Sequence, residues 1–522
     1  MPKPPIHSEK NTAASAGPVA AAPTNSTLRS AAWCLALALV VFSGVLLRFT
    51  PRFSYWVGLD LVGVLESPQY GRAKATLAQV EDPWAPIPAK LHTVIRWRAL
   101  FPMMWHYLKL PRWLLLSMPP VGCVLVLWLV AWLTYTRLHS VSATLLATLL
   151  FAMLPWFFVS TGWLLYFDSW CVLAELAVAF VPGYWGVGAA CLAAPWIDER
   201  FILALPICLG VRAAMFAGNG PSGRRQAVLI LLVVALATFP YLLIRALAWL
   251  NEDPQTRAYV RNHWAEAPLV PLSRYAAGLW SGFRAGWVFV VLGCALAIRR
   301  LGWLGGTLFG LLTTITALTS LFIAQDISRT LMTLCPVLLL GIFLWEWQRP
   351  ARLRLLLPCV VVANMLLPAA HVMWDQQIPI DWLPVEIARY RNPPSVFVAA
   401  RLIAEAEQLI NAGDSQAGEA KLNQAIELDR RYAIAFVKRA SLRMARDETA
   451  AAESDLEEAL KIKADAPTPL LLRGVIRADR GETAAAKNDF QQALLHAPPG
   501  WPGRRAAQDF LDRLNAQTPA QP

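Results

Sequence analysis

The sequence predicts an all-α protein in which a polytopic bundle of nine to eleven membrane helices is followed by a solenoid of helical repeats. Two patterns support this prediction. A series of apolar stretches of membrane length fills residues 31–375, and the last quarter of the chain repeats with a fixed period. Composition agrees, because 56% of the 522 residues are hydrophobic and only 16% are charged, whereas a soluble domain has about 25% charged residues.

The membrane region is predicted to begin directly after a disordered N-terminus. Residues 1–30 are rich in Ala, Pro, Ser and Thr and contain no apolar run. The run 31–47 follows Arg29 and lacks a small-residue cleavage site at its end, which predicts an uncleaved signal anchor. Further runs are close to the ~20 residues that cross a bilayer: 113–135, 141–166, 201–217, 226–250, 275–298, 301–323, 330–347 and 353–371.

Two segments of this region depart from simple crossings. Pro182-Gly183 divides 170–196 into pieces that are short for a full crossing, which favours a tilted or partial hairpin. The long loop 48–112 contains a Pro-rich stretch, 81–88, that cannot be helical. The segment 96–110 that follows is amphipathic, so we expect it to lie in the membrane interface. Its apolar face consists of Trp97, Leu100, Phe101, Met104, Trp105 and Leu108.

Charge indicates how the bundle is oriented. The net charge is +12, and residues 395–522 carry 17 basic against 18 acidic residues, so the surplus belongs to the membrane body. We therefore expect a lipid bilayer as partner and no nucleic acid. Basic residues of short connections fall on one side, which the positive-inside rule makes cytoplasmic: Arg137, Arg224, Arg225, Arg299, Arg300, Arg349, Arg352 and Arg354.

This orientation predicts an integral, multi-pass protein of a plasma or inner membrane, with its N-terminus inside and its C-terminal repeats outside. The loop 48–112 carries nine Lys and Arg and would be external, which pulls the other way, but it is at the length limit of the rule. The eight cysteines lie in or beside apolar runs and form no disulfide or zinc pattern, so they are expected to be small core residues.

The repeat has a period of 34 residues. Small and large apolar residues recur at constant offsets: Ala406, Ala440 and Gly474; Leu422, Leu456 and Phe490; Ala425, Ala459 and Ala493. These positions match the tetratricopeptide repeat (TPR) pattern of two antiparallel helices per unit. We expect three units and a capping helix, Arg504 to Ala516, within a domain 397–516. A Pro-rich linker, 376–396, precedes it as a semi-rigid strut, and 517–522 is expected to be a disordered tail.

Six arginines of this domain recur with the repeat: Arg439, Arg443, Arg446, Arg473, Arg477 and Arg480. Their spacing places each trio on one helical stripe. The stripes either form ion pairs with neighbouring helices or present a basic strip to a protein partner, such as an acidic peptide, or to glycan carboxylates.

Carboxylates gather at the outer ends of the predicted helices: Asp60, Glu66, Glu81, Asp82, Asp168, Asp198, Glu199 and Asp326. Each one alone is explained as a solvated interfacial charge, but their convergence suggests a site. Asp326 and Arg329 are three residues apart and can pair on one helical face. Glu175, Arg245 and Arg284 lie within apolar runs, so they either pair between helices or line a channel for a lipid phosphate.

With acidic residues in a first external loop that ends in an interfacial helix, the chain resembles the polytopic GT-C class of glycosyltransferases. The resemblance implies a lipid-phosphate-linked sugar as donor, and a loop carboxylate that removes a proton from the acceptor. Glu81 and Asp82 match best, with Asp60 and Glu66 as rivals; Asp168 and Asp326 are further catalytic candidates.

Other residues are candidates for holding the substrate. Arg96 and Arg98 would contact the donor phosphate or anchor the segment to lipid headgroups. Arg329 and Arg245 are further phosphate candidates, and the pair Asp198-Glu199 either caps a helix or belongs to the site. No residue is assigned to a metal, and the use of a divalent metal or another cofactor is left open.

The order of parts is similar to that of membrane mannosyltransferases that carry luminal TPR units. We therefore expect a glycosyltransferase that uses a polyprenyl-phosphate-linked sugar and whose TPR domain presents a protein or glycan acceptor. The alternative is a membrane-anchored TPR scaffold without catalysis, which recruits proteins for envelope assembly.

Overall fold

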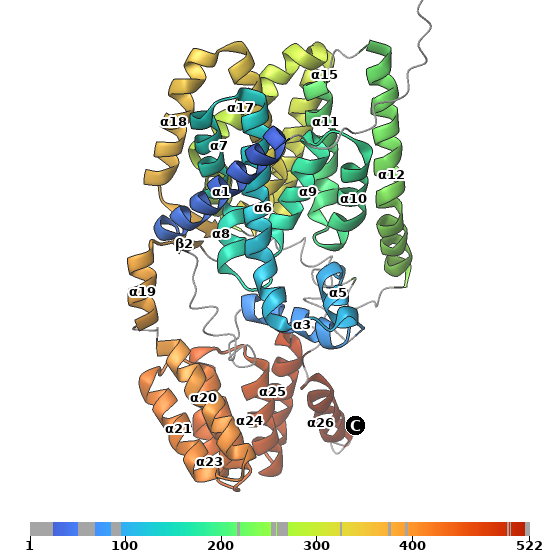
Figure 1. Cartoon of the computed structure of the whole chain (residues 1–522). Coiled ribbons are helices and arrows are strands. Elements are labelled where there is room, and N and C mark those ends of the chain that lie inside the picture. Colours follow the sequence, from blue (N-terminus) through green and yellow to red (C-terminus); the bar gives the residue numbers. More distant parts are fainter. Residues whose placement is uncertain are drawn as a thin grey trace, which may run out of the picture.

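The computed structural model describes residues 25–50, 68–84, 96–216, 220–251, 257, 270–323, 326–373, 377–391, 395–497, 501 and 503–516. Their elements are helices, apart from one antiparallel pair of short strands, β1 (Ala369–Val372) and β2 (Gln377–Ile380). The predicted all-α class is confirmed. Figure 1 shows a bundle of long helices joined to a second helical unit.

The bundle contains the following helices in chain order: α1 (Asn25–Arg48), α6 (Arg112–Leu138), α7 (Val141–Ala152), α8 (Pro155–Gly162), α9 (Asp168–Phe180), α10 (Tyr184–Ala193), η2 (Ala194–Trp196), α11 (Arg200–Phe216), α12 (Gly220–Leu250), α14 (Leu272–Phe283), η4 (Arg284–Gly286), α15 (Trp287–Ile323), α16 (Ile327–Thr330), η5 (Leu331–Leu334), α17 (Cys335–Gln348) and α18 (Pro350–Leu366). Two short helices, α3 (Pro68–Glu81) and α5 (Leu100–Leu108), lie between α1 and α6 in the chain.

Five helical stretches of the described chain are long and apolar enough to cross a bilayer: 27–48, 112–138, 225–250, 272–322 and 327–348. A sixth is added if α7 and α8, which meet at a bend of 60°, count as one span. The expectation of nine to eleven spans counted every apolar run as a crossing. The structure instead breaks several of these runs into shorter helices.

Local chemistry explains most of the breaks. The predicted span 141–166 bends just before Pro155, whose ring cannot continue the preceding helix. The predicted hairpin 170–196 divides into α9 and α10 at Pro182-Gly183, where Gly183 has φ 94°. The runs 275–298 and 301–323 are separated at Gly302, whose φ of 75° favours glycine because it has no Cβ. At Arg284, inside 275–298, φ is 51°.

Three boundaries differ from the expectations. Residues 25–30 belong to α1, so the helix begins before the predicted disordered segment ends, and residues 1–24 lie outside the described chain. The predicted span 353–371 ends as a helix at Leu366 and continues into β1. The predicted strut 376–396 contains β2 and the helix α19 (Leu383–Arg391).

The two ends of the bundle are distinct. At one end, which we call the repeat end, the Thr50 amide donates to the carbonyl of Asp381 at 2.7 Å, so the end of α1 lies beside the chain that leads into α19 and the second unit. At the other end, which we call the arginine end, Arg137 at the end of α6 donates to the carbonyl of Phe180 at the end of α9. Figure 1 shows α3 and α5 at the repeat end, between the bundle and the second unit.

The second unit is the predicted helical-repeat domain. It consists of α20 (Ser395–Asn411), α21 (Ser415–Leu428), α22 (Ala433–Met444), α23 (Thr449–Ile462), α24 (Pro467–Asp479), α25 (Thr483–His496) and the capping helix α26 (Arg504–Ala516). The predicted small and large positions are buried, with 0% exposure for Ala425, Ala459 and Ala493. The described helices form three neighbouring pairs, α20 with α21, α22 with α23 and α24 with α25, and α26 packs against α25, as expected of TPR-like repeats.

The six recurring arginines all form ion pairs inside this domain. Arg439 binds Asp455 at 2.6 Å, and Arg473 binds Asp489 at 2.7 Å, one repeat later. The other four bind the same aspartates or two glutamates of the preceding repeat, as follows: Arg443 to Glu419 and Asp455, Arg446 to Glu419, Arg477 to Glu453 and Asp489, and Arg480 to Glu453. The ion pairs expected of the stripes are therefore present, and four of these arginines link adjacent repeats: Arg443, Arg446, Arg477 and Arg480.

In the first repeat the same position carries the opposite charges. Glu405 takes the place of Arg439 and Lys421 that of Asp455, and they form an ion pair at 2.7 Å. The attraction is preserved although both signs are reversed. This makes the first repeat electrostatically different from the other two.

Candidate functional site

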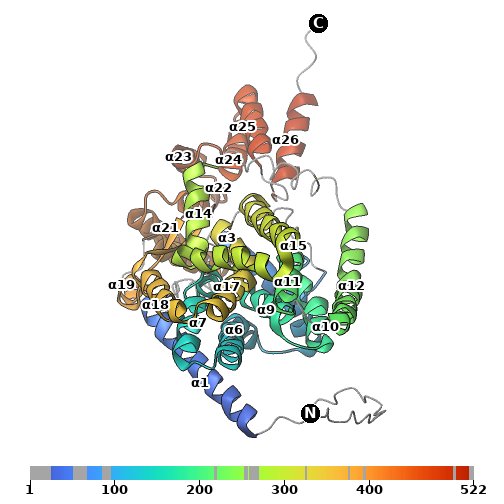
Figure 2. The ribbon, with the colours of Figure 1, turned by 90° about the horizontal axis from the view of Figure 1, so that it is seen from above.

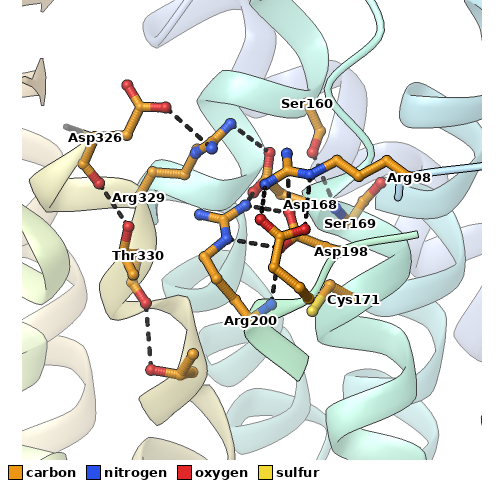
Figure 3. A network of polar contacts seen from close by, with 12 residues as sticks. Arg98, Ser160, Asp168, Ser169, Cys171, Asp198, Arg200, Asp326, Arg329 and Thr330 are labelled. Carbon is orange, nitrogen blue, oxygen red and sulfur yellow. Dashed lines mark hydrogen bonds and ion pairs between the residues drawn. The ribbon is translucent and has the colours of Figure 1, made fainter. Parts of the chain in front are cut away.

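A continuous network of charged side chains occupies the repeat end of the bundle. Its members alternate in charge along the following chain of contacts: Glu199, Arg98, Asp198, Arg200, Asp168, Arg329, Asp326 and His371. The residues come from the segment before α5, the start of α9, the segment before α11 and its first residue, the segment 326–329 at α16, and β1. Figure 3 shows Arg98, Arg200 and Arg329 converging on Asp168 and Asp198.

Asp168 is the central carboxylate. Its side chain is 1% exposed, and it receives Arg200 at 2.6 Å on one oxygen and Arg329 at 3.4 Å on the other. Position also contributes, because Asp168 begins α9, where an acidic residue is stabilised by the helix dipole. Next to Asp168, the Ser160 hydroxyl of α8 accepts a hydrogen bond from the amide of Ser169 in α9 at 3.0 Å, which connects the two helices.

The second buried carboxylate, Asp198, lies between two guanidinium groups. Arg200 donates from Nε to Asp198 at 2.8 Å, and Arg98 approaches the other oxygen at 3.3 Å. Burial alone would raise the pKa of Asp198, but the charges of Arg200 and Arg98 outweigh it and hold the pKa well below its ordinary range. Arg98 also binds both oxygens of Glu199, at 3.0 and 3.2 Å.

The other end of the network reaches the strand pair. Arg329 pairs with Asp326 at 3.0 Å, as the three-residue spacing predicts. Asp326 in turn contacts Nε2 of the buried His371 at 3.3 Å. The Ser328 hydroxyl lies 3.4 Å from the other ring nitrogen and accepts a hydrogen bond from the amide of Val372 at 3.0 Å. The strand β1 is thus connected to the charged network.

Two buried donors of the network have no acceptor among the described residues. They are Nη1 of Arg200 and Nε of Arg329. Both belong to arginines that bind Asp168. Because a buried N–H without a partner is costly, these are the positions at which a further oxygen ligand would be stabilised.

The network brings together six of the predicted residues and leaves others apart. Glu81 ends α3, which places it in a helix rather than in the predicted non-helical stretch, and it forms an exposed ion pair with Arg112. Asp82 is exposed and accepts a hydrogen bond from the Trp84 amide at 2.9 Å. Asp60 and Glu66 lie outside the described residues.

The segment predicted to lie in the interface is shorter than expected. Its helix, α5, covers nine residues, and its apolar residues face two ways. Phe101 and Trp105 are buried, and Phe101 stacks on Phe167 with ring centroids 4.5 Å apart. Met104 and Leu108 are exposed. Arg98 is also buried in the network, which excludes the alternative in which it anchors the segment to lipid headgroups.

A groove of about 890 Å³ lies beside the network, between residues 83–84, α5 and α12. Its walls are mainly apolar and aromatic, and Arg96 is its one charged lining residue among the described residues. Arg96 lies over the ring of Trp84 at 5.6 Å. The lining residue Trp97 directly precedes Arg98, so the groove and the network share a chain segment.

The charges predicted within apolar runs are satisfied in different ways. Arg245 on α12 lies over the ring of Trp97, a groove residue, at 4.7 Å. Arg284 is buried and donates to the carbonyls of Met153 and, at 2.7 Å, Asn364. Glu175 is buried with Cys171 as its hydrogen-bond partner at 3.5 Å. Pairing between helices thus holds for Arg284, through backbone carbonyls rather than through a carboxylate.

Metal binding has no candidate residues in the described part of the chain, which contains no group of three His, Cys, Asp or Glu side chains placed to hold an ion. The carboxylates of the network bind arginines instead.

Sequence reasoning missed two members of the network as site residues, Arg200 and His371. Arg200 has a local signal, because it follows Asp198 by two residues at the start of a helix. His371 has none, because it was placed in a predicted span and becomes a neighbour of Asp326 only through β1.

No protein-family model matches the chain, and no curated protein is similar to it. Among solved structures it is similar to the one titled "First TPR of Spaghetti (RPAP3) bound to HSP90 peptide SRMEEVD", at 19% identity and a TM-score of 0.22. The match covers 23% of this chain and 93% of that chain. This TM-score is too low to indicate a shared fold. The evidence for the repeat architecture is the order of the helices and the buried residues that recur every 34 positions.

Proposed function

We propose that the chain is an integral membrane protein that binds a polyprenyl-phosphate-linked sugar at the repeat end and transfers the sugar to a protein or glycan acceptor held by the TPR domain. One observation carries this proposal. An apolar groove, suited to a polyprenyl chain, adjoins a charged network through the consecutive residues Trp97 and Arg98. A lipid with a phosphate head and an apolar tail matches this pairing of surfaces.

Two residues at the groove have the chemistry for the reaction. Arg96 lines the groove and offers a planar guanidinium to phosphate oxygens. Asp82 is exposed next to the lining residues Pro83 and Trp84, and is the nearest carboxylate in sequence to the lining segment 83–84. We assign it the role of general base: it takes the proton of the acceptor hydroxyl as that oxygen attacks the anomeric carbon, and the bond from that carbon to phosphate breaks, releasing polyprenyl phosphate.

The test uses the full-length protein in nanodiscs with a photoactivatable polyprenyl phosphate. We expect crosslinks to α5 and α12, and a loss of several-fold in crosslinking for Arg96→Gln. Arg112→Gln is the matched control, because Arg112 is exposed and pairs with Glu81, and neither residue lines the groove. Crosslinks spread evenly over the lipid-facing helices, as with a polyprenol that lacks the phosphate, would contradict the proposal.

The second candidate function is a membrane-anchored TPR scaffold. The observation that favours it is that the four network carboxylates already contact an arginine or a histidine. In this case the network holds the repeat end together, and a partner protein binds the TPR domain. Sugar transfer that disappears in Asp82→Asn, with lipid crosslinking retained, would decide for the enzyme; crosslinking without any transfer would decide for the scaffold.

A further inference from the structure

The arginine end of the bundle contains a pair of cations that differs from the network at the repeat end. Arg137 on α6 donates to the carbonyl of Phe180 at 3.1 Å. Arg212 on α11 donates to the carbonyls of Val178 and Val181 at 2.8 and 2.9 Å. Both guanidinium groups therefore bind the last carbonyls of one helix, α9. Neither has a carboxylate within ion-pair distance in the described part of the chain.

The helix end compensates only part of this charge. A helix C-terminus carries about half a negative charge, so two arginines leave a surplus of roughly one and a half positive charges. Both side chains are held in place by aromatic rings. Arg137 lies over Phe180 at 5.4 Å and Phe343 at 5.2 Å, and Arg212 lies over Phe216 at 5.3 Å.

The remaining donors of the two arginines are available to a ligand. A guanidinium group has five N–H donors, and the carbonyl contacts use only part of them. None of the unused nitrogens of Arg137 or Arg212 is among the buried nitrogens without a partner, so these nitrogens reach the surface. Figure 2, which looks onto this end of the bundle, shows α6, α9, α11 and α17 next to one another.

The chain segments around Arg137 and Arg212 have the composition of a membrane interface and lack acidic residues. The described connections 139–140, 181–183 and 349 contain no Asp or Glu. The nearest acid in the sequence at this end, Glu346 on α17, interacts with Arg354. Trp185 is 93% exposed at the start of α10, as is typical of tryptophans at the headgroup level.

We propose that Arg137 and Arg212 form a binding site for the phosphate of an anionic phospholipid. The planar guanidinium group of arginine can donate to two oxygens of a phosphate at once. Basic pockets between membrane helices are suited to binding phosphate-containing headgroups. The site is independent of the proposed sugar transfer, because it lies at the opposite end of the bundle. The competing explanation is that the arginines only cap α9.

The experiment compares lipid retention by full-length variants. Wild type, Arg137→Gln/Arg212→Gln and the control Arg299→Gln/Arg300→Gln are purified, exchanged into mixed phosphatidylglycerol and phosphatidylcholine, and analysed by native mass spectrometry of the folded fraction. The control removes two charges from the same end, where Arg299 binds Gln348 and Arg300 lies over Trp347. We expect wild type and control to retain phosphatidylglycerol and the first variant to lose about tenfold or more. Equal retention in all three would overturn the site.

Two further measurements separate the alternatives. If the glutamine variant does not fold, Arg137→Lys/Arg212→Lys keeps both charges without the planar fork. It is expected to retain the lipid several-fold less well, and wild-type retention would overturn the assignment to guanidinium groups. Inorganic phosphate is then added to the wild type. Displacement of the lipid by millimolar phosphate would overturn the lipid as ligand and assign the site to a soluble phosphate compound; persistence of the lipid supports the proposal.

Discussion

Asp168 is the residue on which the network depends, because it contacts two arginines of different helices, Arg200 on α11 and Arg329 on α16. The replacement Asp168→Asn leaves both cations buried with one partner fewer. We expect a loss of about 3–5 kcal/mol in the free energy of unfolding, since removing one partner of a buried ion pair leaves uncompensated charge.

This cost can be measured by thermal and denaturant unfolding of the protein in detergent. Glu81→Gln is the matched control, because it also removes one carboxylate from an arginine, but in a pair of which both side chains are about two-thirds exposed. The control should cost less than about 1 kcal/mol. Equal costs for the two variants would show that the network is not desolvated.

The sequence predicts the members of this network better than their arrangement. The pair Asp326 and Arg329 follows from helical spacing, and Asp198 and Arg200 are neighbours in the chain. In contrast, Arg98 and Glu199 are 101 positions apart, and the contact of His371 with Asp326 depends on a strand. No local period encodes such contacts, because they result from how separate helices pack.

One turn position of the TPR domain has the same left-handed backbone conformation in each of the three repeats. Gly413, Asp447 and Gly481 are 34 residues apart and have φ of 92°, 60° and 79°. A left-handed backbone costs a residue with a Cβ roughly 1 kcal/mol more than it costs glycine. We therefore expect Asp447→Gly to stabilise the domain and Gly481→Ala to destabilise it, each by about 1 kcal/mol. Melting temperatures that move in the same direction would contradict this account.

The ion pairs between repeats predict a pH dependence. Burial would raise the pKa of Glu419, but hydrogen bonds from Arg446 and Arg443 outweigh it and lower the pKa from its ordinary value of 4.5. A carboxylate with a lowered pKa stabilises the folded state above its ordinary pKa, and this contribution is lost as the pH falls through the folded pKa.

Glu419→Gln should therefore melt below wild type at pH 7, and the difference should shrink as the pH falls from about 4.5 towards 3. Glu427→Gln, at an exposed position of the same helix, is the control and should follow wild type throughout. A difference that stays constant with pH would mean that Glu419 stabilises the repeats by packing and not by charge.

Among the helices of the bundle, the sequence predicts the break at Pro182-Gly183 but not the bend before Pro155 or the break at Arg284. Pro182-Gly183 separates α9 from α10 as expected, and the chain kinks at Gly302 between two predicted spans. The break at Arg284 has no such marker, because this arginine leaves the helix to bind carbonyls of other segments. Hydrogen bonds to distant segments determine the break at Arg284, and a hydropathy average along the sequence cannot detect such bonds.

At the scale of the whole molecule, different groups of charged residues mark the two ends of the bundle. The carboxylates of the network lie at the repeat end, and the short-connection arginines lie at the arginine end, as the alternation of passes predicts. The TPR domain follows α19 at the repeat end (Figure 1). If the positive-inside rule holds, the groove and the repeats face the outside of the membrane together.

Labelling of single cysteines with a membrane-impermeant reagent tests this orientation. In a cysteine-free background, Lys109→Cys after α5 and Ser441→Cys in the TPR domain should react in intact cells, whereas His139→Cys at the arginine end should react only after permeabilisation. All three positions are exposed, unlike Asp168, so a lack of reaction reports the compartment and not burial. If His139→Cys reacts from outside and the other two do not, the groove and repeats face the cytoplasm. An acceptor would then have to be cytoplasmic, and the lipid site of Arg137 and Arg212 would lie in the outer leaflet, where the positive-inside rule no longer accounts for its arginines.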